Sequence, residues 1–212
     1  MPNKDEMYTP RSGRTLLGAT LALALLAWVI GAVNTCIAYV ALGMDWIPIG
    51  SGILLLLFFG LLLTALNNRP WLAFLSILPA LFVLVGSVQY APELALERRG
   101  IRESVVITGD SAQETGGNNH RYVLRREDAV VLDEKLGYDG SGSGYRVGDR
   151  IQVIRDPEGL VPLEDAATVD PAGELDTLLI GTVGLSALAL LAGRRGHVLR
   201  RRDREREVSS RL

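Results

Sequence analysis

The chain has 212 residues, of which 48% are hydrophobic but only 6% aromatic, and a formal net charge of −2. That balance is unusual for a soluble globular domain. The charge is unevenly distributed, because residues 93–176 include ten basic and 18 acidic side chains, whereas residues 194–212 include eight basic and three acidic ones. The chain has a single cysteine, Cys36, which excludes an internal disulfide and a cysteine-ligated metal cluster. We therefore expect a small hydrophobe at this position and no cofactor or metal.

Four windows contain no charged residue: 15–44, 46–68, 70–92 and 177–193. Each is long enough, or nearly so, to cross about 30 Å of hydrocarbon as a helix that rises about 1.5 Å per residue. We expect transmembrane helices at about 16–42, 48–66, 70–91 and 177–193, with the third bent at Pro79. Residues 1–14 then form an N-terminal tail, residues 93–176 an inserted polar domain, and residues 194–212 a basic tail.

Basic residues near the helix ends indicate the orientation, because Lys and Arg stay on the cytoplasmic side. With both termini and the Arg69 turn in the cytoplasm, 12 basic residues lie inside. On the opposite side only Arg98, Arg99 and Arg102 lie near helix ends. We predict a multipass protein of the plasma membrane with cytoplasmic termini and an extracytoplasmic domain at residues 93–176.

Small residues recur on one face of the first helix at alternating spacings of four and three. The stripe consists of Thr20, Ala24, Ala27, Gly31, Asn34, Ala38 and Ala41. Gly181 and Gly184 belong to a similar face of the last helix, and we expect the two faces to pack together. Asn34, the only amide of the stripe, has two open roles: a hydrogen bond to a neighbouring helix, which is the commoner case, or the lining of a substrate path.

The inserted domain has a different periodicity from the helices. Short runs rich in β-branched residues, separated by Gly, Asn and Asp clusters, predict strands at 104–108, 121–125, 129–132 and 150–155, with a closing strand at 160–162. Ile151 and Val153 share one face of their run, opposite polar neighbours. The pattern predicts a small antiparallel sheet or barrel with one buried side. Residues 110–119 and 139–144 are expected to be loops.

The segment from Tyr145 reads Tyr-x-Val-Gly-Asp-x-Ile-x-Val and is followed by Asp-Pro-Glu-Gly, whose residues have type I turn preferences. Over about residues 97–161 this order resembles a widespread family of uncharacterised bacterial multipass membrane proteins. The matching residues are Arg99, Gly100, Tyr122, Tyr145, Val147, Gly148, Asp149, Ile151, Val153, Asp156, Pro157 and Gly159. The resemblance implies a β domain similar to oligomer-binding-type barrels, inserted between transmembrane helices. It implies no activity.

Two tight turns are expected within this motif. The resemblance implies that Gly148 and Asp149 form a turn that leads into a strand, with the Asp149 carboxylate accepting backbone hydrogen bonds. The residues assigned to structural turns are Gly148, Asp149, Asp156, Pro157 and Gly159. The long loop at 133–144 departs from the family pattern.

The polar residues match no catalytic motif. His120 is the only histidine of residues 93–176, and neither a nucleophile elbow nor a zinc-protease motif accompanies it. The glycine–serine run at 140–144 lacks the lysine of a phosphate-binding loop. The acidic pairs at 133–134 and 164–165 lack the ligand spacing of a calcium loop. We expect the glycine–serine run to be a flexible loop and the acidic pairs to be solvated surface.

The basic tail begins directly after the last helix, where it would contact anionic lipid headgroups rather than nucleic acid. The candidate contacts are Arg194, Arg195, Arg200, Arg201 and Arg202. We expect a non-catalytic membrane protein whose β domain binds, or assembles with, an envelope component or partner protein. The alternative is a small transporter or channel component that uses the polar face of the first helix. A third hypothesis, a membrane enzyme that uses His120, has no substrate to name.

Overall fold

The computed structural model describes residues 13–67, 71–112, 119–139 and 145–209, and the side chains within 16–66, 71–112, 120–137 and 145–195. Four helices in these ranges are long and apolar enough to cross a membrane. The helices are α1 (Gly13–Val40), α2 (Trp46–Asn67), a short α3 (Trp71–Leu75), α4 (Ile77–Arg99) and α6 (Pro171–Ser209). The predicted fold class, a multipass helical protein with an inserted β domain, is confirmed.

The bundle is organised around α6, which packs against both α4 and α1. Its interior is formed by large apolar side chains of all four long helices, including Ile30, Phe59, Leu63, Val83 and Leu185, each at most 2% exposed. Equally apolar side chains cover the outside of the bundle, as expected where lipid rather than water is the solvent. Packing of helix against helix therefore depends on shape, not on a hydrophobic stripe.

The third predicted helix is broken at Ser76, between α3 and α4. The break lies three residues before Pro79, whose nitrogen cannot donate to a carbonyl of the preceding turn and whose ring crowds that turn. The Ser76 hydroxyl donates to the Ala73 carbonyl at 2.7 Å. The bend expected at Pro79 is therefore a change of helix. Beyond it α4 continues through Pro92 to Arg99, past the end predicted for the apolar span.

The inserted domain is an antiparallel sheet of five strands, with spatial order β3-β2-β1-β4-β5. The strands are β1 (Ile101–Asp110), β2 (Asn119–Arg126), β3 (Leu136–Asp139), β4 (Arg150–Arg155) and β5 (Glu164–Asp165). An irregularity in β1 between Ile107 and Gly109 bends the sheet, and β3 also contacts β5, so the sheet nearly closes into a barrel. Its core contains Val105, Ile107, Tyr122, Leu124, Leu136, Ile151, Val153 and Leu163.

One strand prediction is wrong and another is met only in part. Within the predicted run 129–132, Val131 forms a bridge with Arg125 of β2 and Leu132 N donates to the Leu124 carbonyl at 2.9 Å, but the run is too short to be a strand of the sheet. Ala129, in the turn before this bridge, has a φ of 65°. Sequence reasoning missed β3 because Gly137 and flanking polar residues hide a strand pattern. The closing strand is β5 rather than 160–162, because the chain around Pro162 connects the turn to β5 without joining the ladder.

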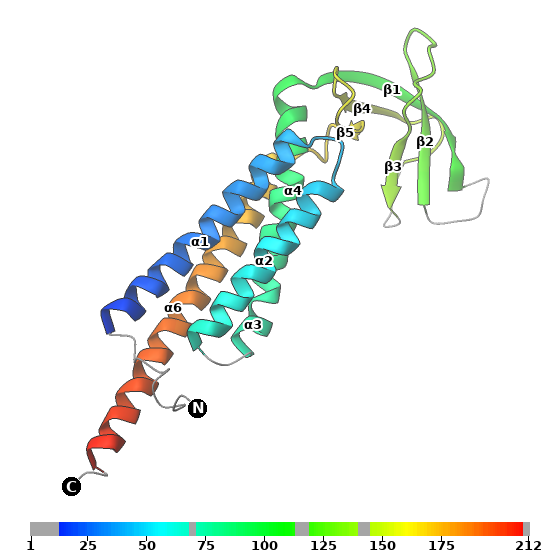
Figure 1. The fold of residues 1–212 in the computed structure, drawn as a ribbon. Helices are drawn as coiled ribbons and strands as arrows, with labels where there is room; N and C mark the ends of the chain where they lie inside the picture. The colour runs from blue at the N-terminus through cyan, green and yellow to red at the C-terminus, as the bar shows by residue number, and fades with distance from the viewer. Residues whose placement is uncertain (1–12, 68–70, 113–118, 140–144, 210–212) are drawn as a thin grey trace, which may run out of the picture.

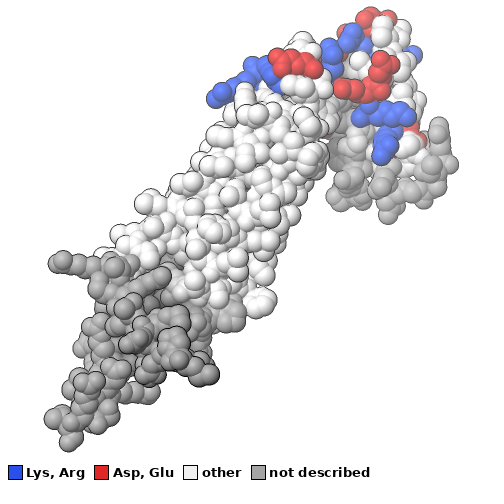
Figure 2. All heavy atoms as spheres, viewed as in Figure 1, with Lys and Arg blue, Asp and Glu red and all other residues white. Residues whose placement is uncertain are grey.

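The β domain lies at one end of the bundle, and α1 begins and α6 ends at the opposite end (Figure 1). The visible face of the bundle is free of charged side chains in its described part, whereas Lys, Arg, Asp and Glu gather over the β domain and the helix ends beside it (Figure 2). At the other end α6 extends beyond the other helices, so the basic tail is a continuation of the last helix as far as Ser209.

Candidate functional site

Asn34 lies at a junction of three helices and is only 1% exposed. Its Nδ2 donates to Ser87 Oγ of α4 at 2.8 Å, and its Oδ1 accepts from Ser51 Oγ of α2 at 2.9 Å. Gly52 permits this approach, because a Cβ there would lie 2.9 Å from Asn34 Nδ2. The amide thus has the first of the two roles left open by the sequence, a bond to neighbouring helices. An amide engaged in this way is a poor lining for a substrate path.

The two glycines of the small-residue face of α6 pack against α4 and not against the small-residue stripe of α1. Gly181 and Gly184 of α6 face Pro79 of α4, and a Cβ at Gly181 would lie 2.6 Å from the Val83 nitrogen. The expected pairing of these two glycines with the α1 stripe is therefore corrected: α4 is their neighbour, because the break at Ser76 brings its backbone close. Other residues of α6 contact α1, with Ser186 Oγ donating to the Ala24 carbonyl at 3.2 Å.

The remaining stripe residues of α1 do face the bundle interior. Thr20, Ala27 and Ala38 are all at most 5% exposed. A Cβ at Gly31 would lie 3.3 Å from side-chain atoms of Leu178 and Thr182, both on α6. The small-residue stripe of α1 is thus covered by α6 and its neighbours, although the residues of α6 that contact it are not Gly181 and Gly184.

Of the five basic-tail arginines, the side chains of Arg194 and Arg195 are described and exposed. The Arg195 guanidinium carbon lies 5.3 Å from the centroid of the Trp71 ring, an arrangement that favours a cation–π contact. Arg200, Arg201 and Arg202 lie in the part of α6 whose side chains fall outside the described ones. Cys36 is exposed on the surface of α1, so its thiol faces outward from the bundle rather than into it.

A joint of hydrogen bonds, an ion pair and apolar packing connects the β domain to the helices. The Asp156 carboxylate is buried between α4 and the β4–β5 connection, where it accepts backbone hydrogen bonds from Glu158, Leu160 and Val161 at 3.0 to 3.2 Å. Arg99, at the end of α4, adds an ion pair at 3.0 Å. Burial alone would raise the pKa of Asp156, but the three N–H groups and the arginine together hold it below its ordinary value.

Glycines make two turns of the β domain possible, one at the joint and one at the opposite end of β4. Gly159 closes the Asp-Pro-Glu-Gly turn with a φ of 65° and donates to the Asp156 carbonyl at 3.0 Å. Gly148 has a φ of 103°, and the Asp149 carboxylate beside it accepts from the Arg146 nitrogen at 2.7 Å. These φ values lie in a region that residues with a Cβ rarely adopt. The arrangement at Gly148 and Asp149 is the turn into β4 that the family resemblance implies.

The α1–α2 connection also belongs to the joint. Gly43 has a φ of 81°, and a Cβ there would lie 2.6 Å from the Leu160 carbonyl oxygen. Beneath it a small apolar cluster joins α4 to the sheet through Ala95, Leu96, Ile154 and Val161, each at most 2% exposed. The β domain is therefore fixed to the bundle by a charge pair, backbone contacts and apolar packing.

A polar and aromatic row extends from the other end of β1 and β2 into the barrel. His120 Nδ1 lies 2.8 Å from Asp110 Oδ2, and the imidazole is stacked on Tyr122 with 5.8 Å between ring centroids. The ring of Tyr122 meets that of Tyr145 edge-on at 6.4 Å, and the Tyr145 hydroxyl donates to the buried Asp165 carboxylate. We call these five residues the His120 row.

Asp110 determines how the His120 ring is oriented. Its side chain is 4% exposed, whereas that of His120 is 33% exposed. Burial would raise the pKa of Asp110, but the hydrogen bond from His120 and the backbone N–H of Ala112 lower it below the ordinary value. An ionised Asp110 orients the imidazole with Nδ1 toward the carboxylate, which leaves Nε2 for an external hydrogen-bond partner.

Sequence reasoning singled out His120 but not its partners. The register of β1 against β2 pairs Asp110 with Tyr122, and this pairing brings Asp110 beside His120. Nothing in the local sequence around Asp110 indicates the pairing, since it depends on the irregularity between Ile107 and Gly109. In the described part of the chain no three His, Cys, Asp or Glu side chains form a group that could hold a metal ion.

Comparisons with known protein families, with curated proteins and with solved structures found no match. The family resemblance of the Tyr145–Gly159 motif therefore remains a prediction, and the function has to be argued from the geometry of this chain.

Proposed function

We propose that this protein is a membrane-anchored, non-catalytic binding module. The helices anchor it in the plasma membrane, both termini are cytoplasmic, and the β domain lies outside the cell, where it contacts an envelope component or a partner protein. Four apolar helices of spanning length support the anchor. The excess of Lys and Arg at the helix ends opposite the β domain supports the orientation, and anionic lipid headgroups are the natural partners of those arginines.

The observation that carries the binding role is the His120 row. Its imidazole is partly exposed, yet an ionised carboxylate and a stacked ring fix its orientation. Because the His120 side chain is already oriented, little of its entropy is lost when a partner contacts it, and preorganisation of this kind favours binding. The joint at Asp156 supports the same role, because it holds this surface in a fixed relation to the membrane anchor.

The proposal is tested by cross-linking in intact cells. A photoreactive amino acid replaces Arg121, the exposed residue that follows His120 in β2. We expect a cross-linked species that disappears in His120→Asn, a variant that keeps a donor toward Asp110 but removes the ring. The matched control is Val130→Ser, just after the turn that follows β2, which should leave the species unchanged.

Three results would count against the binding role. One is a cross-linked species that persists in His120→Asn. Another is its equal loss in Val130→Ser. The third is the absence of any species while the wild-type protein is present at the membrane. Thermal unfolding of both variants, measured on the purified full chain, separates loss of contact from loss of fold.

A further inference from the structure

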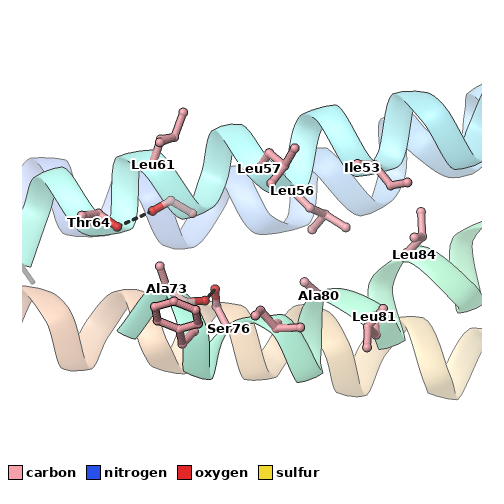
Figure 3. A pocket seen from close by; sticks show the side chains of 13 residues that line it. Ile53, Leu56, Leu57, Leu61, Thr64, Ala73, Ser76, Ala80, Leu81 and Leu84 are labelled. Carbon is pink, nitrogen blue, oxygen red and sulfur yellow. Dashed lines mark hydrogen bonds between the residues drawn. The ribbon is translucent and has the colours of Figure 1, made fainter. Parts of the chain in front are cut away.

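An apolar groove of about 700 Å³ lies between α2 and the α3–α4 segment (Figure 3). It exists because α3 and α4 are separate helices on either side of Ser76, and because small residues lie on its walls where larger ones would fill it. Gly60 and Ala73 are examples, and no atom lies within 4 Å of the position that a Cβ at Gly60 would take. The groove is thus a consequence of Pro79 and of two or three small side chains.

The walls of the groove suit hydrocarbon rather than a polar ligand. Of the lining residues, only Thr64 and Ser76 have hydroxyl groups. Both hydroxyls donate to backbone carbonyls of their own segment, Thr64 to Gly60 at 2.9 Å and Ser76 to Ala73 at 2.7 Å (Figure 3). The groove therefore presents methyl and methylene groups, and Leu61 and Phe74, at 70% exposure each, form its rims.

Its length matches one leaflet of a bilayer. The α2 wall runs from Ile53 to Thr64, which corresponds to about 16 Å at about 1.5 Å per residue. Half of a hydrocarbon core is about 15 Å thick. An acyl chain that enters at the Thr64 end would therefore reach the middle of the membrane within the groove.

A cation lies at that same end of the bundle. Ala73 lines the groove, and Trp71, two residues earlier on α3, is the ring over which the Arg195 guanidinium lies at 5.3 Å. Trp and Arg are typical of the headgroup level of a bilayer, and a guanidinium fork matches the oxygens of a phosphate. The positive charge at this end of the bundle complements an anionic headgroup, which distinguishes this occupant from a neutral lipid or a neighbouring apolar helix.

We propose that the groove between α2 and α3–α4 seats one acyl chain of an anionic bilayer phospholipid, whose phosphate is bound by Arg195 beside Trp71. This site is independent of the β domain and of its proposed binding role. The basic tail alone attracts anionic headgroups without selecting a position for them. The groove would hold one lipid in a defined place, by both its acyl chain and its headgroup.

The test uses the full chain in lipid nanodiscs that contain phosphatidylglycerol or phosphatidylcholine with a photoreactive group on the acyl chain. The readout is the label on peptides that cover residues 53–64 and 73–84. We expect phosphatidylglycerol to label them about fivefold more than phosphatidylcholine, the factor that one basic charge near an anionic surface supplies. Arg195→Gln should remove this preference, and Arg194→Gln, at the adjacent exposed arginine, should retain it.

A matched pair of glycine variants tests the groove itself. Gly60→Leu fills it, whereas Gly50→Leu adds the same side chain to the same helix at a position that is also open but outside the groove. We expect only Gly60→Leu to reduce the label. Equal labelling by the two lipids, equal effects of the two leucines, or a cross-link between two copies of the chain at the groove would each overturn the proposal.

Discussion

Arg99 and Asp156 are 57 residues apart in the chain, and the hydrogen bond from Arg99 Nη2 to Asp156 Oδ2, at 3.0 Å, joins the end of α4 to the β4–β5 connection. Asp156→Asn would place an amide N–H group against N–H donors of the backbone. We expect the full chain in detergent to lose about 2 kcal/mol of unfolding free energy, since buried donors lose their acceptor while Arg99 stays partly hydrated. Thermal unfolding measures the loss.

The control for this substitution is Glu158→Gln. Glu158 also pairs with Arg99, but its side chain is 58% exposed. An exposed ion pair contributes about 0 to 1 kcal/mol. If Glu158→Gln were as damaging as Asp156→Asn, the joint would depend on surface charge rather than on the buried carboxylate.

Acid should weaken the same joint. Because the pKa of Asp156 in the folded protein lies below its ordinary value of 3.8, its contribution to stability is fully present above that value and is lost as the pH falls through the folded pKa. The melting temperatures of wild type and Asp156→Asn should therefore begin to converge as the pH falls below 3.8 and should meet below the folded pKa. A constant difference down to the acid limit would contradict this account.

Glu164 in β5 should behave in the opposite way. Burial raises its pKa above the ordinary value of 4.5, so the folded state is penalised when the carboxylate is charged. Glu164→Gln should raise the melting temperature at pH 7, and its advantage should fade as the pH falls below the folded pKa and disappear below 4.5. A destabilised Glu164→Gln at pH 7 would show that the charge has a partner in the folded domain.

The helix bundle and the approximate position of the β domain could be predicted because charge-free length and β-branched runs are local signals. Asn34 could be singled out, but Ser51 and Ser87 could not, because hydroxyls are common in membrane helices and the partner depends on how the helices rotate. Gly181 was predicted to pack against α1 and packs against α4, again because the sequence does not show how the helices rotate. The pairing of Asp110 with His120 depends on an irregularity in β1 that no local pattern indicates.

Packing of α6 against α4 should tolerate no side chain at Gly181. A Cβ there would lie 2.6 Å from the Val83 nitrogen and 2.7 Å from the Pro79 carbonyl oxygen, so two backbones would have to separate. We expect Gly181→Ala to cost about 1–3 kcal/mol of unfolding free energy, as other cases of overpacking do. Gly18→Ala, at a position with no atom within 4 Å, is the matched control and should be neutral or slightly stabilising.

The hydrogen bond between Asn34 and Ser87 can be measured by a double-mutant cycle. Asn34→Ala and Ser87→Ala should each destabilise the bundle, and the double variant by less than the sum, with a coupling energy of about 0.6–1 kcal/mol. Additive effects would mean that the amide contributes through shape alone. A loss of solute flux in Asn34→Ala, at normal unfolding temperature and expression, would instead favour the transporter alternative.

The proposed orientation predicts opposite labelling of the two ends of the bundle. The native thiol of Cys36 is exposed on α1, so the experiment uses a Cys36→Ala background. Val130→Cys, on the exposed β2 hairpin, should react with a membrane-impermeant maleimide in intact cells, whereas Ser209→Cys, at the end of α6, should react only after the cells are opened. The reason is that the eight basic residues after Gly193 resist translocation. Labelling of Ser209→Cys but not Val130→Cys in intact cells would reverse the topology, and with it the proposal that the His120 row meets its partner outside the cell.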